Sequence, residues 1–186
     1  MIYSVKEIYF TIQGEGFQTG KHAVFCRFSG CNLWTNQEKD RANATCNFCD
    51  TDFVGTDGLN GSKYTSADKL SEKIEEVWDR FEGEKFVVFT GGEPLLQLDS
   101  ELIDALHHRG FKIAVETNGT LLPPENIDWI CVSPKKGADF KLKYGNELKL
   151  VYPQETFNPD QFKDLEFDHF FLQPMDGKDL QRNILQ

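Results

Sequence analysis

Three of the five cysteines in this sequence lie in one segment, and their number limits the chemistry that they can perform. Fourteen residues separate Cys31 from Cys46, whereas Cys46 and Cys49 have the Cys-x2-Cys spacing of half a zinc ribbon. A structural zinc site takes four protein ligands. The other two cysteines, Cys26 and Cys131, lie in apolar runs, where we expect buried core thiols. The segment therefore offers three ligands and no evident fourth.

An iron–sulfur cluster accounts for three thiols more directly. A [4Fe–4S] cluster held by three thiolates has one iron without a protein ligand, and a small molecule can occupy that position. In a reducing compartment, clustered thiols serve metal or redox chemistry more often than disulfides. We therefore predict that residues 31–49 form an enlarged loop that binds a [4Fe–4S] cluster through Cys31, Cys46 and Cys49. A non-catalytic zinc protein is the alternative.

The elements that position this loop follow from hydrophobic patterning. Six short apolar runs, each ending near Gly or Pro, are predicted to be buried parallel strands: residues 23–30, 85–92, 112–119, 129–135, 147–153 and 169–174. Apolar residues at helical spacing predict one helix from an N-cap at Thr65 through Leu70 to Phe81, and a second from Leu98 to Leu106.

Alternation of strands and helices predicts an α/β fold with a largely parallel sheet covered by helices. About six strands are too few for a complete eight-stranded barrel. We therefore predict a partial, splayed β/α barrel, with an open doubly wound sheet as the alternative.

Polar residues stand at the carboxyl ends of four predicted strands. In parallel α/β folds the ligand binds outside these ends, so separate segments are expected to converge on one site. The residues are Thr90, Gly92 and Glu93, then Glu116 and Asn118, then Ser133 and Lys135, and finally Gln173.

Composition excludes several classes of function. The net charge of −10 disfavours a surface that binds nucleic-acid phosphates and favours a small-molecule substrate. No apolar run is long enough to span a bilayer, and the start of the chain lacks the pattern of a signal peptide. We expect a cytoplasmic protein whose 186 residues form one domain.

Several short motifs resemble those of a known family. "GGEP" (91–94), "ETNG" (116–119) and "SPK" (133–135) resemble segments that contact S-adenosylmethionine (SAM) in radical SAM enzymes. With "EIYFTIQGEG" (7–16), "CDT" (49–51) and "LQPMDG" (172–177), they resemble the 7-carboxy-7-deazaguanine synthase family over essentially the whole chain. The usual radical SAM spacing is Cys-x3-Cys-x2-Cys, and some members of this family carry an enlarged loop between the first two cysteines.

This resemblance implies a carbon–nitrogen lyase of queuosine-type deazapurine biosynthesis. The family converts 6-carboxy-5,6,7,8-tetrahydropterin to 7-carboxy-7-deazaguanine and ammonia by radical ring contraction. The implied cofactors are a [4Fe–4S] cluster, SAM and Mg²⁺, and the implied partners are a flavodoxin- or ferredoxin-like electron donor and a second copy in a homodimer. A glycyl-radical-type activating enzyme, with a protein as its substrate, is the alternative within the superfamily.

The resemblance also implies roles for individual residues. Those implied to bind substrate are Gln13, Gly14, Glu15, Arg27, Thr90 and Glu116. Those implied to bind SAM are Phe48, Gly92, Glu93, Asn118, Ser133, Lys135 and Gln173, and the Thr51 hydroxyl is implied to bind Mg²⁺, with Asp50 the weaker choice.

Some of these residues have simpler interpretations. Arg27 stands in an apolar run and should meet an anion, which is either the substrate carboxylate or an internal partner such as Glu116. "QGEG" is also typical of a strand-ending turn with solvated side chains, and "CDT" of a helix cap.

The end of the sequence gives one more expectation. The family commonly continues after "LQPMDG" through a helix to a last strand and a tail with a His that reaches the substrate, whereas this sequence gives "KDLQRNILQ". We expect intact cluster and SAM binding with impaired substrate affinity or turnover, because an open pocket admits water.

Overall fold

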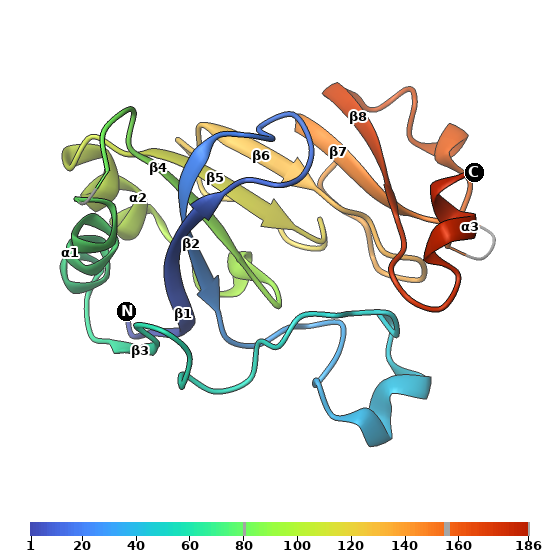
Figure 1. The fold of residues 1–186 in the computed structure, drawn as a ribbon, viewed down its shortest axis with the longest axis horizontal. Coiled ribbons are helices and arrows are strands. Elements are labelled where there is room, and N and C mark those ends of the chain that lie inside the picture. The colour runs from blue at the N-terminus through green and yellow to red at the C-terminus, as the bar shows by residue number, and fades with distance from the viewer. Residues whose placement is uncertain (80, 155–156, 186) are drawn as a thin grey trace.

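One sheet forms the body of the protein. The computed structural model describes residues 1–79, 81–154 and 157–185, and in them eight strands follow the spatial order β3-β1-β2-β4-β5-β6-β7-β8 (Figure 1). The strands are β1 Tyr3–Ile12, β2 His22–Phe28, β3 Ser62–Tyr64, β4 Phe86–Gly91, β5 Lys112–Thr117, β6 Trp129–Val132, β7 Tyr144–Tyr152 and β8 Glu166–Pro174.

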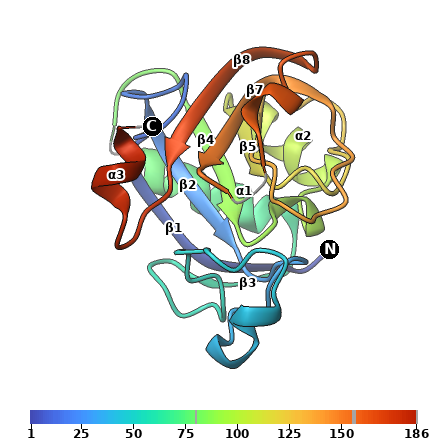
Figure 2. The same cartoon turned by 90° about the vertical axis from the view of Figure 1, so that its right-hand side faces the viewer.

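Six of these strands run parallel and correspond to the six predicted apolar runs. They pair in the order β2, β4, β5, β6, β7 and β8. Within the described residues the edge strands β3 and β8 do not pair with each other, so the sheet curls without closing (Figure 2). The predicted partial barrel with a largely parallel sheet is confirmed.

The prediction of about six strands was too low, because β1 and β3 were missed. Both pair antiparallel, β1 with β2 and β3 with β1. A register shift between Val5 and Glu7 interrupts the alternation of apolar and polar residues in β1 that marks a half-buried strand. β3 has only three residues, and two of them, Ser62 and Lys63, are exposed.

Both predicted helices are present, but they begin and end at other residues than predicted. α1 spans Ala67–Trp78, α2 spans Ser100–His108 and α3 spans Leu180–Ile184. The predicted N-cap at Thr65 is wrong: the Ser66 side chain accepts a hydrogen bond from the Lys69 amide at 3.3 Å and caps α1. Phe81 lies beyond α1, where its ring stacks on Phe10, and Leu98 precedes α2.

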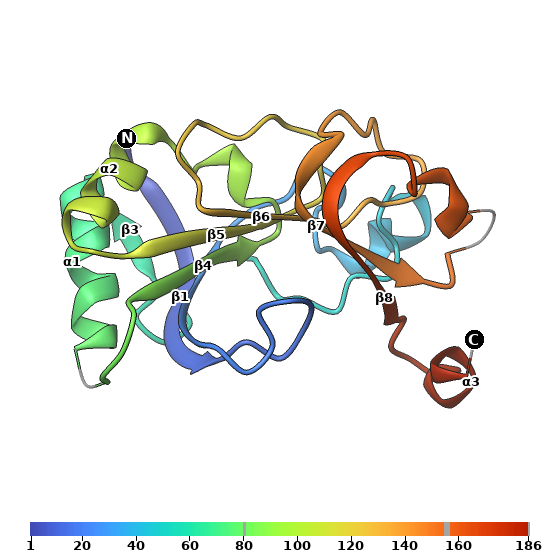
Figure 3. The same ribbon diagram turned by 90° about the horizontal axis from the view of Figure 1, so that it is seen from above.

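The two longer helices cover one face of the sheet. α1 and α2 lie together on the convex side (Figures 1 and 3), where residues such as Ile8, Cys26, Leu70, Leu102 and Ile113 form the main core. Cys26 is therefore a core thiol, as predicted. The concave face carries a smaller apolar cluster, which consists of Ala23, Phe25, Phe86, Val88, Ala114 and Trp129.

The cysteine loop extends from the sheet between β2 and β3. Within residues 29–61 the regular structure is a single 3-10 helix, η1 (Glu38–Asn43), and the loop hangs below the carboxyl ends of β2 and β4 (Figure 1). Two further 3-10 helices are η2 (Pro94–Leu96) and η3 (Pro159–Gln161). In the part of the chain that the structure describes, no helix has the length and apolar character to cross a membrane.

Candidate active site

A buried carboxylate lies where β4 and β5 end. Glu93 follows β4, is fully buried, and its Oε1 accepts a hydrogen bond from the Leu95 amide at 2.9 Å, which caps η2. The same oxygen accepts from the Thr117 hydroxyl at 2.8 Å, and Oε2 accepts from the Asn118 amide at 2.8 Å. Burial raises the pKa of Glu93, while these donors and the Lys135 ammonium oppose the rise.

The backbone beside this carboxylate holds the beginning of the cysteine loop. The Glu93 amide donates to the Gly30 carbonyl at 3.0 Å. A Cβ on Gly92 would overlap that carbonyl and would lie 2.7 Å from the Cβ of Cys31. Only glycine permits this approach, so Cys31 is fixed against the end of β4.

A side-chain amide network ties the next loop residue to the end of β5. Asn118 donates from Nδ2 to the Asn32 Oδ1 at 3.0 Å, and Asn32 donates to the Thr120 hydroxyl at 2.7 Å. The Thr120 hydroxyl in turn donates to Asn118 Oδ1 at 2.6 Å. Asn118 and Thr120 are buried, so this network is shielded from competing water.

The three predicted cluster ligands interact electrostatically. The interaction between the Cys46 and Cys49 thiols lowers the pKa of Cys49 and raises that of Cys46. Burial raises the pKa of Cys31, and the charge of Cys49 raises it further. The Leu33 amide, which donates to the Cys31 Sγ at 3.4 Å, opposes this rise.

The donor set suits an iron–sulfur cluster better than a bare metal ion. Across residues 1–79, 81–154 and 157–185, no three His, Cys, Asp or Glu side chains stand at the spacing that would hold a single ion. Three thiols that interact with one another, with an amide N–H directed at one sulfur, fit the larger cluster, whose sulfurs accept such hydrogen bonds. Cys131 is not part of this set; it is buried on the concave face beside Glu147.

The residues after β6 face the same thiols. Lys135 donates from Nζ to the Ser133 carbonyl at 2.7 Å and to the Ser133 hydroxyl at 2.6 Å. Burial lowers the pKa of Lys135, and negative charge at the nearby Cys46 and Cys49 acts in the opposite direction. The ends of β4, β5 and β6 thus converge around the cysteine loop, as their sequence positions predicted.

A second group of charges lies on the concave face. Lys149, in β7, is buried, and its ammonium contacts Glu116 Oε2 at 2.7 Å and Glu15 Oε2 at 2.8 Å. Gln13 donates to Glu116 Oε1 at 2.8 Å and accepts from the Glu15 amide at 3.2 Å. Burial acts to lower the pKa of Lys149, but the two carboxylates outweigh it and the pKa is raised.

These contacts revise the interpretation of "QGEG". The segment is a turn after β1, as the simpler interpretation expected; Glu15 is exposed, with 47% of its side chain accessible, but the expectation of a solvated side chain is wrong for Gln13, which is buried. A Cβ on Gly14 would have no atom within 4 Å. There is thus open space beside Gly14, and its role in binding substrate stays a prediction.

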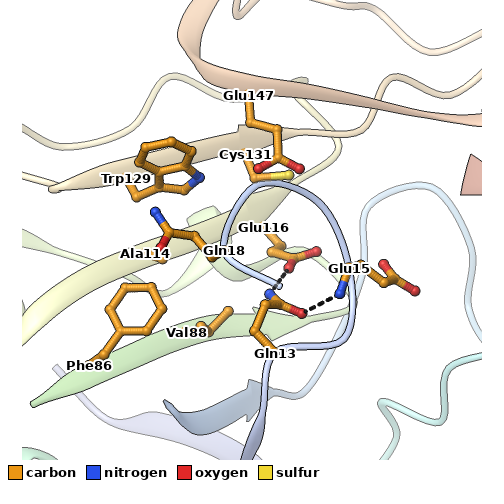
Figure 4. A pocket seen from close by; sticks show the side chains of 10 residues that line it. All are labelled: Gln13, Glu15, Gln18, Phe86, Val88, Ala114, Glu116, Trp129, Cys131 and Glu147. Carbon is orange, nitrogen blue, oxygen red and sulfur yellow. Dashed lines mark hydrogen bonds between the residues drawn. The ribbon is translucent and has the colours of Figure 1, made fainter. Parts of the chain in front are cut away.

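A narrow pocket lies next to these charges (Figure 4). Its lining consists of Gln13, Glu15, Gln18, Phe86, Val88, Ala114, Glu116, Trp129, Cys131 and Glu147. The Phe17 amide donates to Glu147 Oε2 at 3.2 Å, and the Phe17 ring stacks on Trp129 and His169. The segment after β1 therefore closes over the concave face and is anchored on β6, β7 and β8.

Arg27 faces the concave side but has a different internal partner from the one expected. Its Nε donates to Glu7 Oε1 at 2.8 Å, and Nη2 donates to the Tyr9 hydroxyl at 3.3 Å. The proposed pairing with Glu116 is wrong, because Glu116 is bound by Lys149 and Gln13. Burial acts to lower the pKa of Arg27, and its hydrogen bond to Glu7 contributes to a net rise.

The remaining predicted residues lie around the same region. Thr90 and Gln173 are half-buried near the carboxyl ends of β4 and β8, and Phe48 is half-buried between two of the cysteines. The Thr51 hydroxyl donates to Asp50 Oδ1 at 3.3 Å. Because no helix begins at "CDT", its interpretation as a helix cap is wrong. The ligand-binding roles of all these residues stay predictions.

Sequence reasoning missed four polar residues of the site. Lys149, Glu147 and Asn32 stand in no motif quoted above, and Glu7 opens "EIYFTIQGEG" but was assigned no role. A signal existed for two of them: Glu147 and Lys149 interrupt the apolar run "ELKLVYP", and a charge in a strand predicted to be buried on both faces needs a partner.

Comparison with known proteins gives one consistent result. The model of the radical SAM superfamily matches residues 40–159. The chain is 60% identical over 177 residues to 7-carboxy-7-deazaguanine synthase of Bordetella pertussis, which covers 95% of this chain and 84% of that protein. It is 60% identical over 183 residues to the Caulobacter vibrioides protein of that name, covering 98% and 87%. The crystal structure of QueE from Escherichia coli is similar with a TM-score of 0.70 at 25% identity, covering 98% of this chain and 87% of that one.

The contacts of Lys149 generate a prediction about stability. Replacing Lys149 with Met should lower the free energy of unfolding by about 2–3 kcal/mol, because it leaves two carboxylates without their counter-charge. The loss should be smaller than the roughly 3–5 kcal/mol of a fully buried pair, since the Glu15 side chain is 47% exposed. Urea unfolding of the apoprotein measures it, and adding Glu116→Gln should recover part of the loss. The control is Lys141→Met, because the Lys141 side chain is 53% exposed and its amine lies 3.4 Å from Asp139 Oδ2. Equal stability of the Lys149→Met and Lys141→Met proteins would contradict this account.

Proposed function

The chain belongs to the 7-carboxy-7-deazaguanine synthase family of radical SAM enzymes, and we propose on that basis that it converts 6-carboxy-5,6,7,8-tetrahydropterin to 7-carboxy-7-deazaguanine and ammonia. The observation that carries the proposal is the 60% identity to two such synthases over nearly the whole chain. The charged side chains that line the pocket on the concave face support a small polar substrate. The queuosine pathway is the metabolic setting.

Membership in the radical SAM superfamily implies a [4Fe–4S] cluster and SAM. When bound, these groups supply a 5′-deoxyadenosyl radical that takes a hydrogen atom from the substrate. We infer that Cys31, Cys46 and Cys49 are the cluster ligands, because three interacting thiols lie beside the strand ends. We also assign SAM contacts to Gly92, Glu93, Asn118, Ser133 and Lys135, with Phe48 and Gln173 at the margins.

The concave face supports a specific orientation for the substrate. Arg27 has five N–H donors, and its contacts to Glu7 and Tyr9 use two of them, so we assign the substrate carboxylate to this guanidinium. The Glu116 and Gln13 side chains suit the donor and acceptor edge of a pterin ring. The Lys149 ammonium contacts the carboxylates of both Glu116 and Glu15, and it thereby holds in place the side chains that we assign to the pterin ring.

The remaining cofactor and partner assignments are proposals of the same kind. We propose that the Thr51 hydroxyl binds Mg²⁺, a hard cation that takes oxygen ligands. We further propose a flavodoxin- or ferredoxin-like electron donor, a homodimer, and action in the cytoplasm, where a reducing environment preserves free cluster thiols.

Cluster assembly and product formation test the proposed function. After anaerobic reconstitution, the wild type should form 7-carboxy-7-deazaguanine in a SAM-dependent reaction, followed by mass spectrometry. Replacing Cys31, Cys46 or Cys49 singly with Ala should abolish both cluster assembly and product, because each removes one of three ligands. Cys26→Ala and Cys131→Ala are the matched controls and should retain nearly all of the iron, since both thiols are buried outside the loop. A Cys31→Ala protein with a SAM-cleaving cluster would refute the ligand assignment.

The proposed Mg²⁺ role of Thr51 gives a separate prediction. Thr51→Ala should reduce turnover far more than SAM affinity, and added Mg²⁺ should restore part of the activity. Thr35→Ala is the control, because that hydroxyl lies in the same loop and donates to Asp40 at 3.1 Å. Steady-state rates and SAM binding measure both. If the wild type turns over equally with and without a chelator of divalent cations, Thr51 has no such role.

A further inference from the structure

The insertion between Cys31 and Cys46 contains a helix that no hydrophobic core holds. None of the residues of η1 is buried, yet the helix lies directly before the Cys46-x2-Cys49 turn. A segment of this kind needs polar contacts to keep one conformation. Besides the hydrogen bond from the Thr35 hydroxyl to Asp40, the side-chain contacts that tie η1 to the rest of the loop come from Arg41.

Arg41 joins three parts of the cysteine loop. Its Nη1 donates to the carbonyl oxygens of Asn47 and Cys49 at 3.0 and 3.1 Å. Its Nε and Nη2 donate to the two carboxylate oxygens of Glu38 at 2.8 and 2.7 Å. The guanidinium also lies 4.0 Å from the centre of the Trp34 ring. One planar group therefore connects the start of the loop, η1 and the turn.

The Trp34 ring, on which the Arg41 guanidinium stacks, is itself held in place by packing. Trp34 is buried and packs edge-on against Phe53, which follows the turn, with ring centroids 6.0 Å apart. The ion pair with Glu38 contributes little to stability, because the Glu38 side chain is 76% exposed. The hydrogen bonds to the two turn carbonyls therefore tie the turn to η1, in addition to the bond from the Cys46 amide to the Leu33 carbonyl at 3.4 Å.

The chemistry of these contacts requires arginine. A guanidinium is a planar fork with several donors that can stack on an aromatic ring while it binds acceptors at its edge, whereas a lysine ammonium is a compact point charge. The positive charge also lies near both thiols of the turn: although the hydrogen bond to Glu38 is the larger cause, the charges of Cys49 and Cys46 help to raise the pKa of Arg41.

We propose that Arg41 is a positioning residue for the iron–sulfur cluster: it fixes the Cys46-x2-Cys49 turn so that its thiols and Cys31 share one cluster, and it places a positive charge beside them. This inference rests on the proposed cluster ligation. Partners outside the ligand sphere orient metal ligands in this way, and charge near a cluster changes its reduction potential.

Variants of Arg41 separate its geometric role from its charge. Arg41→Gln should lose its cluster to a chelator about tenfold faster than the wild type, and its midpoint potential should become more negative, because a positive charge that favours the reduced cluster is removed. Arg41→Lys should keep a potential near that of the wild type but should still lose the cluster faster. Anaerobic chelation kinetics and redox titration followed by electron paramagnetic resonance measure the two properties.

A matched control and a cluster-free measurement complete the test. Arg109→Gln removes a guanidinium of similar exposure, 30% against 31% for Arg41, from an ion pair with Glu75 outside the cysteine loop, and should behave like the wild type. In the apoprotein, amide hydrogen exchange at residues 46–50 should rise in Arg41→Gln and not in Arg109→Gln. Wild-type exchange there, or a wild-type rate of cluster loss and potential in Arg41→Gln, would overturn the proposal. Failure of the wild type to assemble any cluster would instead refute the proposed function, and the exchange measurement would still decide the role of Arg41.

Discussion

The site depends on one buried carboxylate that receives hydrogen bonds from two strand ends. Glu93 accepts from the Leu95 amide, the Thr117 hydroxyl and the Asn118 amide, and its own amide holds the Gly30 carbonyl. A buried carboxylate is costly unless its oxygens are satisfied, so the segments that supply these donors must stay in place. The position of Cys31 follows from that requirement. Because Gly92 has no Cβ, the loop at Gly30 and Cys31 can pack directly against the backbone that follows β4.

On the concave face, too, buried charged groups are satisfied by partners, here through ion pairs. Among the residues that the structure describes, no long helix covers this face, which carries Arg27 with Glu7 and Lys149 with Glu15 and Glu116. Each cation is paired before any ligand binds, which reduces the reorganisation required when a substrate enters. The segment after β1 contributes Glu15 to this arrangement and is itself held by the stacking of Phe17 on Trp129 and His169. The same carboxylates therefore hold both the charged concave face and the segment that closes over it.

The sequence was sufficient to predict the parts of this site that depend on local pattern. Apolar runs that end in polar residues located the ends of β4, β5 and β6, because parallel strands bring those ends to one edge. The ion pairs between residues of different strands could not be predicted from such local patterns. The pairing of Arg27 with Glu7 depends on β1, whose register shift hid it as a strand, and that of Lys149 with Glu15 depends on how far the sheet curls. The start of α1 was missed by one residue because Thr65 and Ser66 are both good N-caps.

Amide hydrogen exchange in the cluster-free protein tests most directly whether Glu93 holds the cysteine loop against the strand ends. In Glu93→Gln, either orientation of the new amide places an NH₂ group against a backbone N–H, of Asn118 or of Leu95, and at least one hydrogen bond is lost. Exchange at residues 30–33 and 117–120 should therefore be faster than in the wild type, since an unsatisfied buried polar group costs about 1–3 kcal/mol. Glu101→Gln is the control, because the Glu101 side chain is 65% exposed, and it should leave exchange in both segments unchanged. Wild-type protection of residues 30–33 in Glu93→Gln would contradict the account.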